Sequence, residues 1–195
     1  MDLGLLTSPD DKVWLNIVAN SYRITGDGSF GSDGNAIPVT GTATIPAFTN
    51  FFPNTQPTIG ANSLKVGSTF SGVLYAEATT VAGGSLVSVT MNWGGVAVLP
   101  IIINLQSIPL FTTMPIRIYF EVGVLVDGEF GSGYADYTVV VGGNATYPVF
   151  RLYQNRVGVN INTIVDLPVT ITGSWNNPSA ENVLRIFCAW MRREI

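Results

Sequence analysis

The feature that most limits how this chain can fold is a two-residue alternation of apolar and polar side chains. The clearest case is residues 116–126, where apolar residues at even positions alternate with Arg117, Tyr119 and Glu121. Successive side chains of a strand point to opposite faces, whereas an amphipathic helix repeats every three to four residues. We therefore expect this segment, and others like it, to form β-strands.

Short alternating runs recur along the chain, and Gly, Asn and Asp separate them. The spacing suits hairpins and predicts an antiparallel β-sandwich or barrel rather than βαβ units. The last run could begin as a short helix at Ser179, but Phe187 and Trp190 fit a terminal strand, which we favour. The expected strands cover residues 13–19, 39–45, 63–78 (a pair broken at glycines), 85–93, 96–99, 116–126, 134–141, 157–164, 167–175 and 183–191.

The N-terminal segment differs from the rest of the chain. It contains five of the eight aspartates and a Gly-rich stretch at residues 26–35. Such a stretch has too few apolar residues to offset the entropy lost on ordering. We expect residues 1–38 to form an extended attachment arm, anchored to another protein or subunit by Trp14, Leu15 and Ile17, and residues 39–195 to form the β-domain.

Several classes of function are excluded by composition. The chain has no histidine and a single cysteine, Cys188, which rules out His-based catalysis, Cys/His zinc sites and an intrachain disulfide. Lys and Arg number 9 against 13 Asp and Glu, without a basic tract, so we expect no nucleic-acid binding.

The distribution of apolar residues indicates a chain that does not insert into a membrane. The most apolar run, residues 96–111, is interrupted by Pro100 and Pro109 and is too short to span a bilayer. The N-terminus lacks the positive charge of a signal peptide. Only 11% of residues are charged while 47% are hydrophobic, which predicts that copies of the chain or partner proteins cover much of the surface.

No motif in the sequence predicts a metal or cofactor. The string D-G-x-F-G-S occurs at Asp27 and again at Asp127, which raises the alternative of calcium loops. The EF-hand glutamate is missing, so we interpret both strings as turns and expect no metal and no cofactor.

Acid/base catalysis has one candidate pair. Glu121 and Asp136 lie on neighbouring expected strands and could face each other. We favour instead two exposed sheet residues, or an ion pair between Glu121 and Arg117. Neither a nucleophile elbow nor a phosphate-binding Gly-Lys-Ser loop is present, so we expect no enzymatic activity.

Loop residues are the candidate ligand-binding groups. Trp93 precedes the turn at Gly94 and Gly95, and a second hairpin loop spans residues 127–133. We expect these distal loops to remain free for a host-surface ligand such as a glycan, although Trp93 could instead pack in the core or at an interface. The second loop contributes Asp127, Glu129 and Phe130.

Six strings carry a family resemblance, and two of them are G-T-A at residues 41–43 and the G-x-x-G-S hairpin within residues 128–134. Residues 59–70 read I-G-A-N-S-L-K-V-G-S-T-F, residues 92–95 read N-W-G-G, residues 115–122 read P-I-R-I-Y-F-E-V, and residues 166–184 include Asp166, Trp175 and Asn182 at spaced positions. They resemble a recurring domain of virion appendage proteins from tailed phages and metagenomic viruses. The resemblance covers residues 41–195 and marks strand and turn positions.

The resemblance implies a jelly-roll-like fibre head or surface decoration that closes as a homotrimer on a virion assembled in the host cytoplasm. Other virion proteins would then be the partners of the arm. The alternatives are a capsid or tail shell component and, from another class, a carbohydrate-binding or carbohydrate-active domain. The outward faces of residues 134–141 and 183–191 are themselves rather apolar, which predicts a subunit contact at or near Phe187 and Met191.

Overall fold

The computed structural model describes residues 58–80, 86–105, 110–142, 149–176 and 182–194, with the backbone alone described at 149–154, 187–190 and in short strands of the first 46 residues. No helix in these residues is long and apolar enough to cross a bilayer. The strands are β1 (Leu5–Leu6), β2 (Leu15–Asn16), β3 (Tyr22–Thr25), β4 (Ser29–Ser32), β5 (Asn35–Pro38), β6 (Ala43–Pro46), β7 (Thr58–Ile59), β8 (Thr69–Thr80), β9 (Leu86–Trp93), β10 (Val96–Asn104), β11 (Thr112–Val126), β12 (Ser132–Gly142), β13 (Val149–Asn160), β14 (Leu167–Trp175) and β15 (Val183–Glu194).

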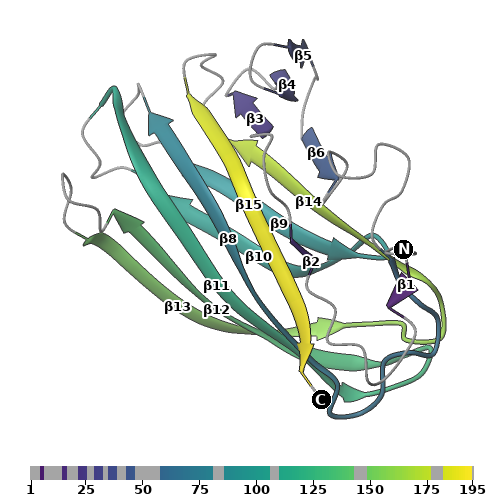
Figure 1. The fold of residues 1–195 in the computed structure, drawn as a ribbon. Helices are drawn as coiled ribbons and strands as arrows, with labels where there is room; N and C mark the ends of the chain where they lie inside the picture. The colour runs from purple at the N-terminus through teal and green to yellow at the C-terminus, as the bar shows by residue number, and fades with distance from the viewer. Residues whose placement is uncertain are drawn as a thin grey trace.

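Two sheets pack against each other around one hydrophobic core (Figure 1). The smaller sheet has the order β1-β7-β14-β9-β10, with β6 also paired to β14. The larger sheet has the order β13-β12-β11-β8-β15-β3-β4-β5, with β2 also paired to β15. Apart from the parallel pair β1–β7, the paired strands are antiparallel. The antiparallel β-sandwich expected from the sequence is confirmed.

Eight of these strands form a nested set of pairs. In chain order these strands are β3, β6, β8, β9, β10, β11, β14 and β15. The outermost two, β3 and β15, pair with each other, and inside them β6 pairs with β14, β8 with β11 and β9 with β10. This nesting is the strand order of a jelly roll, whose two sheets carry alternate pairs. The hairpin β12–β13 is an addition that extends the larger sheet beyond β11.

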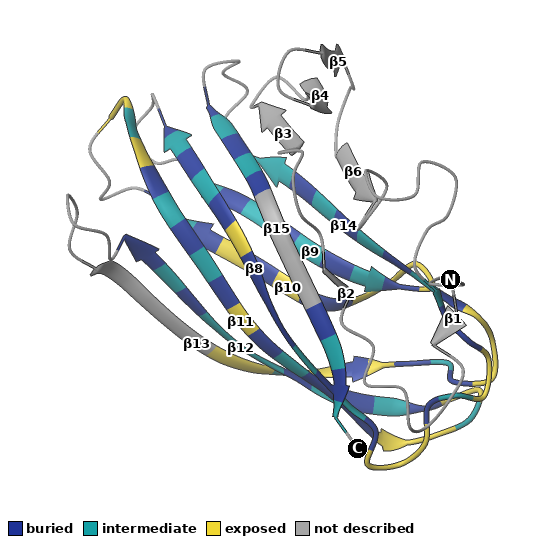
Figure 2. Cartoon of the chain, in the orientation of Figure 1, coloured by how far each residue is buried: buried dark blue, intermediate teal, exposed yellow. Residues whose placement is uncertain are grey.

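Strand β11 shows how alternation builds the core. Ile116, Ile118 and Phe120 are buried, while Tyr119 between them faces away and is exposed (Figure 2). The same alternation holds in β9, where every second side chain from Val87 onward is buried. Both faces were predicted correctly from the sequence, because apolar side chains of an open sheet must face its partner sheet.

Glycine geometry decides two turns. Gly94 and Gly95 connect β9 to β10 with φ of 58° and 83°, the left-handed pair that matches the twist of a two-residue hairpin. Gly67, with φ of 86°, lies in a turn that precedes β8. The expected strand pair at residues 63–78 is therefore wrong at its start. Residues 61–68 precede β8 as a loop with turns at 61–62 and 66–67, and Gly72 lies inside a continuous β8.

A β-bulge in β15 reverses the expected faces of the C-terminal strand. Ile186 pairs with Ala76 and Cys188 with Tyr75, so Phe187 is the inserted residue. Buried residues are therefore even-numbered up to Ile186, whereas Met191 is buried beyond the bulge. The prediction of a subunit contact at Met191 is wrong, because its side chain is 2% exposed and belongs to the core of its own chain.

The arm and its anchor are described only as backbone strands. β2 and β3 pair with β15, and β4 and β5 continue from β3. The side chain of Leu15, like Trp14 and Ile17 as a whole, lies outside the described residues. The side chain of Phe187 lies outside them as well. Backbone pairing nevertheless makes β3 of this segment a strand of the larger sheet. The domain boundary at residue 38 and the contacts of the arm with another protein stay predictions.

Candidate functional site

An open groove crosses the larger sheet where β8, β11, β12 and β13 lie next to one another. Its volume is about 760 Å³, within the roughly 300–1,000 Å³ that ligand sites usually occupy. A floor of paired strands gives such a groove a rigid base. The lining residues are Ser71, Gly72, Val73, Tyr119, Phe120, Glu121, Asp136, Tyr137, Thr138, Asn155 and Arg156.

Strand register places a row of polar residues across the groove. Ser71, Glu121, Asp136 and Arg156 are successive Cα partners on β8, β11, β12 and β13. Directly opposite residues on one face bring their Cβ atoms to about 5 Å. The sequence-based expectation that Glu121 and Asp136 could face each other is confirmed by this register.

Tyr134 on β12 holds one of the two carboxylates. Its hydroxyl donates a hydrogen bond of 2.6 Å to Glu121 Oε1. The ring lies over Gly123, where an added Cβ would come within 2.4 Å of Tyr134 Cε1. An ion pair with Arg117 was one of the two interpretations favoured for Glu121, but the described contact of its side chain is to Tyr134.

Arg156 on β13 holds the other carboxylate. Its Nε donates to Asp136 Oδ1 at 2.6 Å and its Nη2 to Oδ2 at 2.5 Å, so the pair is bidentate. The guanidinium carbon also lies 4.8 Å from the centre of the Tyr134 ring. Such stacking of a cation on an aromatic face adds to the ion pair. The four side chains thus form one connected network.

Hydrogen bonds within this network shift the pKa values of Tyr134, Asp136 and Arg156. The hydrogen bond to Glu121 raises the pKa of Tyr134, which stays a neutral donor. The hydrogen bonds from Arg156 lower the pKa of Asp136, which stays ionised, and Asp136 in turn raises the pKa of Arg156. The row therefore presents acceptors from Asp136 and Glu121 and donors from Arg156.

Aromatic and hydroxyl groups complete the groove. The side chain of Tyr119 is 42% exposed, and its Cα partners are Val73 and Thr138. At the β8 side, Ser71 Oγ donates to Glu194 Oε1 at 2.7 Å. The groove therefore combines an accessible aromatic ring with hydrogen-bonding groups on a flat sheet surface.

The loops that were predicted to bind a ligand meet at one end of the sandwich, which we call the loop end. It contains the turn at Gly94, residues 61–67, residues 127–131 and residues 161–166. Gly94 N donates to Pro168 O, and Thr163 N donates to Gly128 O at 3.0 Å. Asp127, Glu129 and Phe130 are exposed here, as predicted, together with Gly94 and Gly95.

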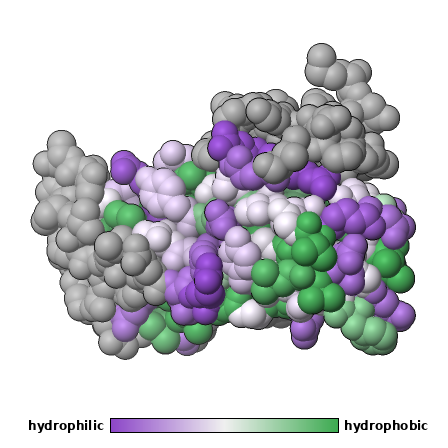
Figure 3. Space-filling model, turned by 90° about the horizontal axis from the view of Figure 1, so that it is seen from below, coloured by the Kyte–Doolittle hydropathy of each residue, from purple (hydrophilic) through white to green (hydrophobic). Residues whose placement is uncertain are grey.

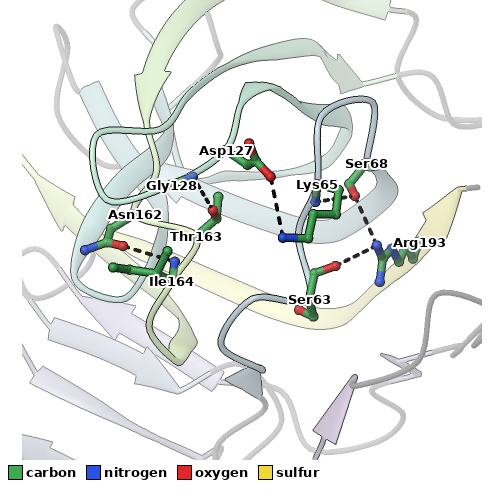
Figure 4. A network of polar contacts seen from close by, with 9 residues as sticks. All are labelled: Ser63, Lys65, Ser68, Asp127, Gly128, Asn162, Thr163, Ile164 and Arg193. Atoms are coloured by element: carbon green, nitrogen blue, oxygen red, sulfur yellow. Dashed lines mark hydrogen bonds and ion pairs between the residues drawn. The ribbon is translucent and has the colours of Figure 1, made fainter.

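A network of polar contacts ties the loop end together (Figure 4). Lys65 Nζ lies 3.5 Å from Asp127 Oδ2, and Thr163 Oγ1 accepts from Gly128 N at 2.7 Å. Arg193 is 8% exposed and donates to Ser63 O and Ser68 Oγ. Burial lowers the pKa of Arg193. These contacts fasten the turn before β8 to the last strand.

Trp93 does not belong to the exposed loop end. It is 1% exposed, and its ring meets Phe70 edge to face with centroids 5.2 Å apart. It continues the inward row of Val87, Val89 and Met91 on β9. The prediction that Trp93 is available to a surface ligand is therefore wrong, and the alternative of core packing is correct.

Apolar side chains are also exposed at the loop end. Phe130 is 89% exposed at the tip of its turn. Figure 3 shows hydrophobic residues at the surface among hydrophilic ones, seen from below. The exposed apolar residues of these loops and adjoining strand ends are Val66, Leu125, Val126, Phe130, Ile164 and Val165.

Metal ligands do not gather in the described part of the chain. Within it, no group of three or more Asp, Glu or Cys side chains is close enough to hold an ion. Asp127 contacts Lys65 instead. Asp27 of the calcium alternative lies outside the described residues.

The groove was only partly visible from the sequence. Its two carboxylates were named, but Tyr119, Tyr134 and Arg156 were not. Tyr119 and Tyr134 lie at outward positions of their alternating runs, so the alternation alone could have identified both as residues of the outer face. Arg156 gives no such signal, because only the register of β12 with β13 places it beside Asp136.

Comparisons with known proteins give a distant likeness. No family model matches the sequence, and no curated protein matches it. Among solved structures, arcelin-5, a lectin-like defense protein from Phaseolus vulgaris, is 8% identical, with 96% of this chain and 95% of that chain covered and a TM-score of 0.36. A lectin from Bauhinia forficata in complex with GalNAc is 10% identical (94% and 99% covered, TM-score 0.34). A legume lectin-like domain from Entamoeba histolytica is 10% identical (90% and 85% covered, TM-score 0.31).

Proposed function

We propose that this chain is a carbohydrate-binding domain that holds an oligosaccharide in the groove across β8, β11, β12 and β13. The observation that carries the proposal is the polar row of Ser71, Glu121, Asp136 and Arg156 beside the exposed ring of Tyr119. Both belong to one rigid sheet surface, open enough to admit an extended chain.

The chemistry of a sugar matches this arrangement. Sugar hydroxyls both donate and accept hydrogen bonds, and the groove offers carboxylate acceptors together with guanidinium donors. The C–H face of a sugar ring is apolar, and an exposed aromatic ring such as Tyr119 can pack against it.

The groove groups are held in place before any ligand arrives. Asp136 is fixed by two bonds from Arg156, and Glu121 by the Tyr134 hydroxyl. Less side-chain freedom is then lost on binding. Preorganisation of this kind supports a binding role.

We propose binding without hydrolysis. A glycosidase needs one carboxyl group whose raised pKa keeps it protonated as the general acid. In the groove, Arg156 lowers the pKa of Asp136 instead. Asp136 is thus an acceptor at neutral pH and a poor proton donor.

The test is an oligosaccharide array followed by calorimetric titration of the strongest binder. Tyr119→Ala should weaken that binding about fivefold, because an aromatic contact contributes about 1 kcal/mol. The control is Phe111→Asn, which removes an exposed ring in the turn just before β11, outside the groove, and suits the φ of 59° there. Absence of any binding, or binding that ignores Tyr119, would contradict the proposal.

A second candidate function is structural: a trimeric fibre head, surface decoration or shell component of a virion, attached through residues 1–38. The observation that favours it is the apolar loop end, where Phe130 and Leu125 are 89% and 57% exposed. Assembly would allow neighbouring proteins to cover such side chains. The two functions are compatible, since a fibre head can bind a host-surface glycan.

The solution mass of the purified chain tests the structural role. A stable trimer supports the fibre head, whereas a monomer contradicts it. Phe187→Asp should then give a monomer or an insoluble chain. A soluble, unchanged trimer from that variant would place the subunit contact elsewhere.

A further inference from the structure

We infer that the groove selects uncharged oligosaccharides over acidic ones, an inference that rests on the proposed carbohydrate-binding function. The observation behind it is the balance of charges that line the groove. Two carboxylates, Glu121 and Asp136, face one guanidinium, Arg156, so the lining carries a net charge of −1. A carboxylate, sulfate or phosphate on a sugar would meet this charge at short range.

The one cation of the lining has one edge of its guanidinium already bonded to a carboxylate. Guanidinium groups recognise acidic ligands through pairs of parallel N–H donors. In Arg156 the pair formed by Nε and Nη2 is bonded to Asp136, and the plane is stacked near Tyr134. An acidic ligand would have to compete with Asp136 for that edge of the guanidinium.

The carboxylates have unfilled hydrogen-bond acceptor positions, which favour a ligand with hydroxyl donors. A carboxylate offers about four acceptor positions, and Glu121 has one described bond, from Tyr134. Hydroxyl groups of a neutral sugar can donate to the remaining positions. An ionised acid group has no proton to donate there, so it would leave them unfilled and add repulsion.

Two other cations lie next to lining residues: Arg192, which is the Cα partner of Ser71 and is bonded through its Nε to Glu194, and Arg117. Arg117 lies two residues before Tyr119 on β11, and it does not line the groove. An acidic ligand that reached Arg117 would bypass the repulsion. Binding of acidic ligands through Arg117 is therefore the alternative outcome of the binding experiment.

The experiment measures binding of oligosaccharide pairs that differ only in charge. Suitable pairs are trigalacturonate and its methyl ester, and 3′-sialyl-N-acetyllactosamine and the methyl ester of its sialic acid, within a wider array of such pairs. In the wild-type chain we expect the neutral member of a binding pair to bind about tenfold or more tightly than the acidic member. The difference should shrink as salt rises, because ions screen the repulsion.

A matched pair of variants locates the effect. Glu121→Gln keeps the acceptor for Tyr134 and removes the net charge, so the preference should fall to about twofold. Glu129→Gln makes the same change in total charge at an exposed site outside the groove, and the preference should stay as in the wild type.

Each contrary result has a distinct meaning. Equal or tighter binding of the acidic members, or a preference that Glu121→Gln leaves unchanged, overturns the inference while the carbohydrate-binding function stands. Acidic binding that Arg117→Gln abolishes shows recognition by Arg117 and overturns it as well. If no member of any pair binds, the proposed function itself fails, and the inference with it.

Discussion

Tyr134 lies between two glycines, and replacing each one with alanine should have opposite effects on stability. Gly123 on β11 and Gly158 on β13 are both Cα partners of Tyr134. A Cβ on Gly123 would lie 2.4 Å from Cε1 and 2.8 Å from the hydroxyl oxygen of Tyr134, whereas a Cβ on Gly158 meets nothing within 4 Å. The ring must therefore move in Gly123→Ala and stays in place in Gly158→Ala.

The size of the effect follows from the contact that is lost. Displacing the ring breaks the hydrogen bond from Tyr134 to Glu121, and a bond to a charged group contributes about 1.5 kcal/mol or more when it is only partly exposed. Alanine also reduces the freedom of the unfolded chain, which contributes about 0.5 kcal/mol in the opposite direction. We expect Gly123→Ala to lower the free energy of unfolding by about 1 kcal/mol and Gly158→Ala to raise it by about 0.5 kcal/mol.

Urea unfolding of both variants measures the difference, and a double-mutant cycle assigns it. With Tyr134→Ala already present, the cost of Gly123→Ala should vanish. Ultraviolet titration should also show the raised pKa of Tyr134 moving toward its usual value in Gly123→Ala. Equal stability of the two single variants would refute the placement of the ring over Gly123.

Three further predictions concern the core, pH and metal. Met191→Ala should lower the free energy of unfolding by about 2–4 kcal/mol and Met191→Leu by less than about 1.5 kcal/mol, because the side chain is buried; equal, small losses in chemical denaturation would contradict its core position. The pKa of Asp136 is lowered by Arg156, so the pair stabilises the fold above about pH 4 and this contribution is lost as the pH falls through the lowered pKa. The melting temperature of the wild type should thus fall more than that of Asp136→Asn below about pH 4, and parallel curves would argue against the pair. EDTA should leave the melting temperature unchanged, and a drop of several degrees would revive calcium binding near Asp127.

The architecture could be predicted from alternation because burial imposes it locally. In β9 and β11 one face must meet the opposite sheet, so the apolar positions appear directly in the sequence. Trp93 follows the same parity as Val89 and Met91 on β9. The alternation of β9 therefore predicts a core position for Trp93, whereas the two glycines that follow it predict only a nearby turn.

Other features depend on contacts between distant segments and have no local signal. The bulge at Phe187 moves Met191 to the inner face, and nothing in residues 183–191 marks it, because both parities there hold apolar side chains. The groove has the same origin. Glu121 and Arg156 lie 35 positions apart, and only the register across β12 brings them into one row.

The added hairpin β12–β13 makes the proposed binding surface modular. Two strands of the jelly roll, β8 and β11, supply Ser71, Tyr119 and Glu121, while the hairpin supplies Asp136 and Arg156. Half of the groove is thus encoded by one contiguous segment that lies outside the eight nested strands. Under the proposed function, exchange of that segment, in evolution or by grafting, would change which ligand binds, while the strand pairing of the eight-stranded scaffold would stay the same.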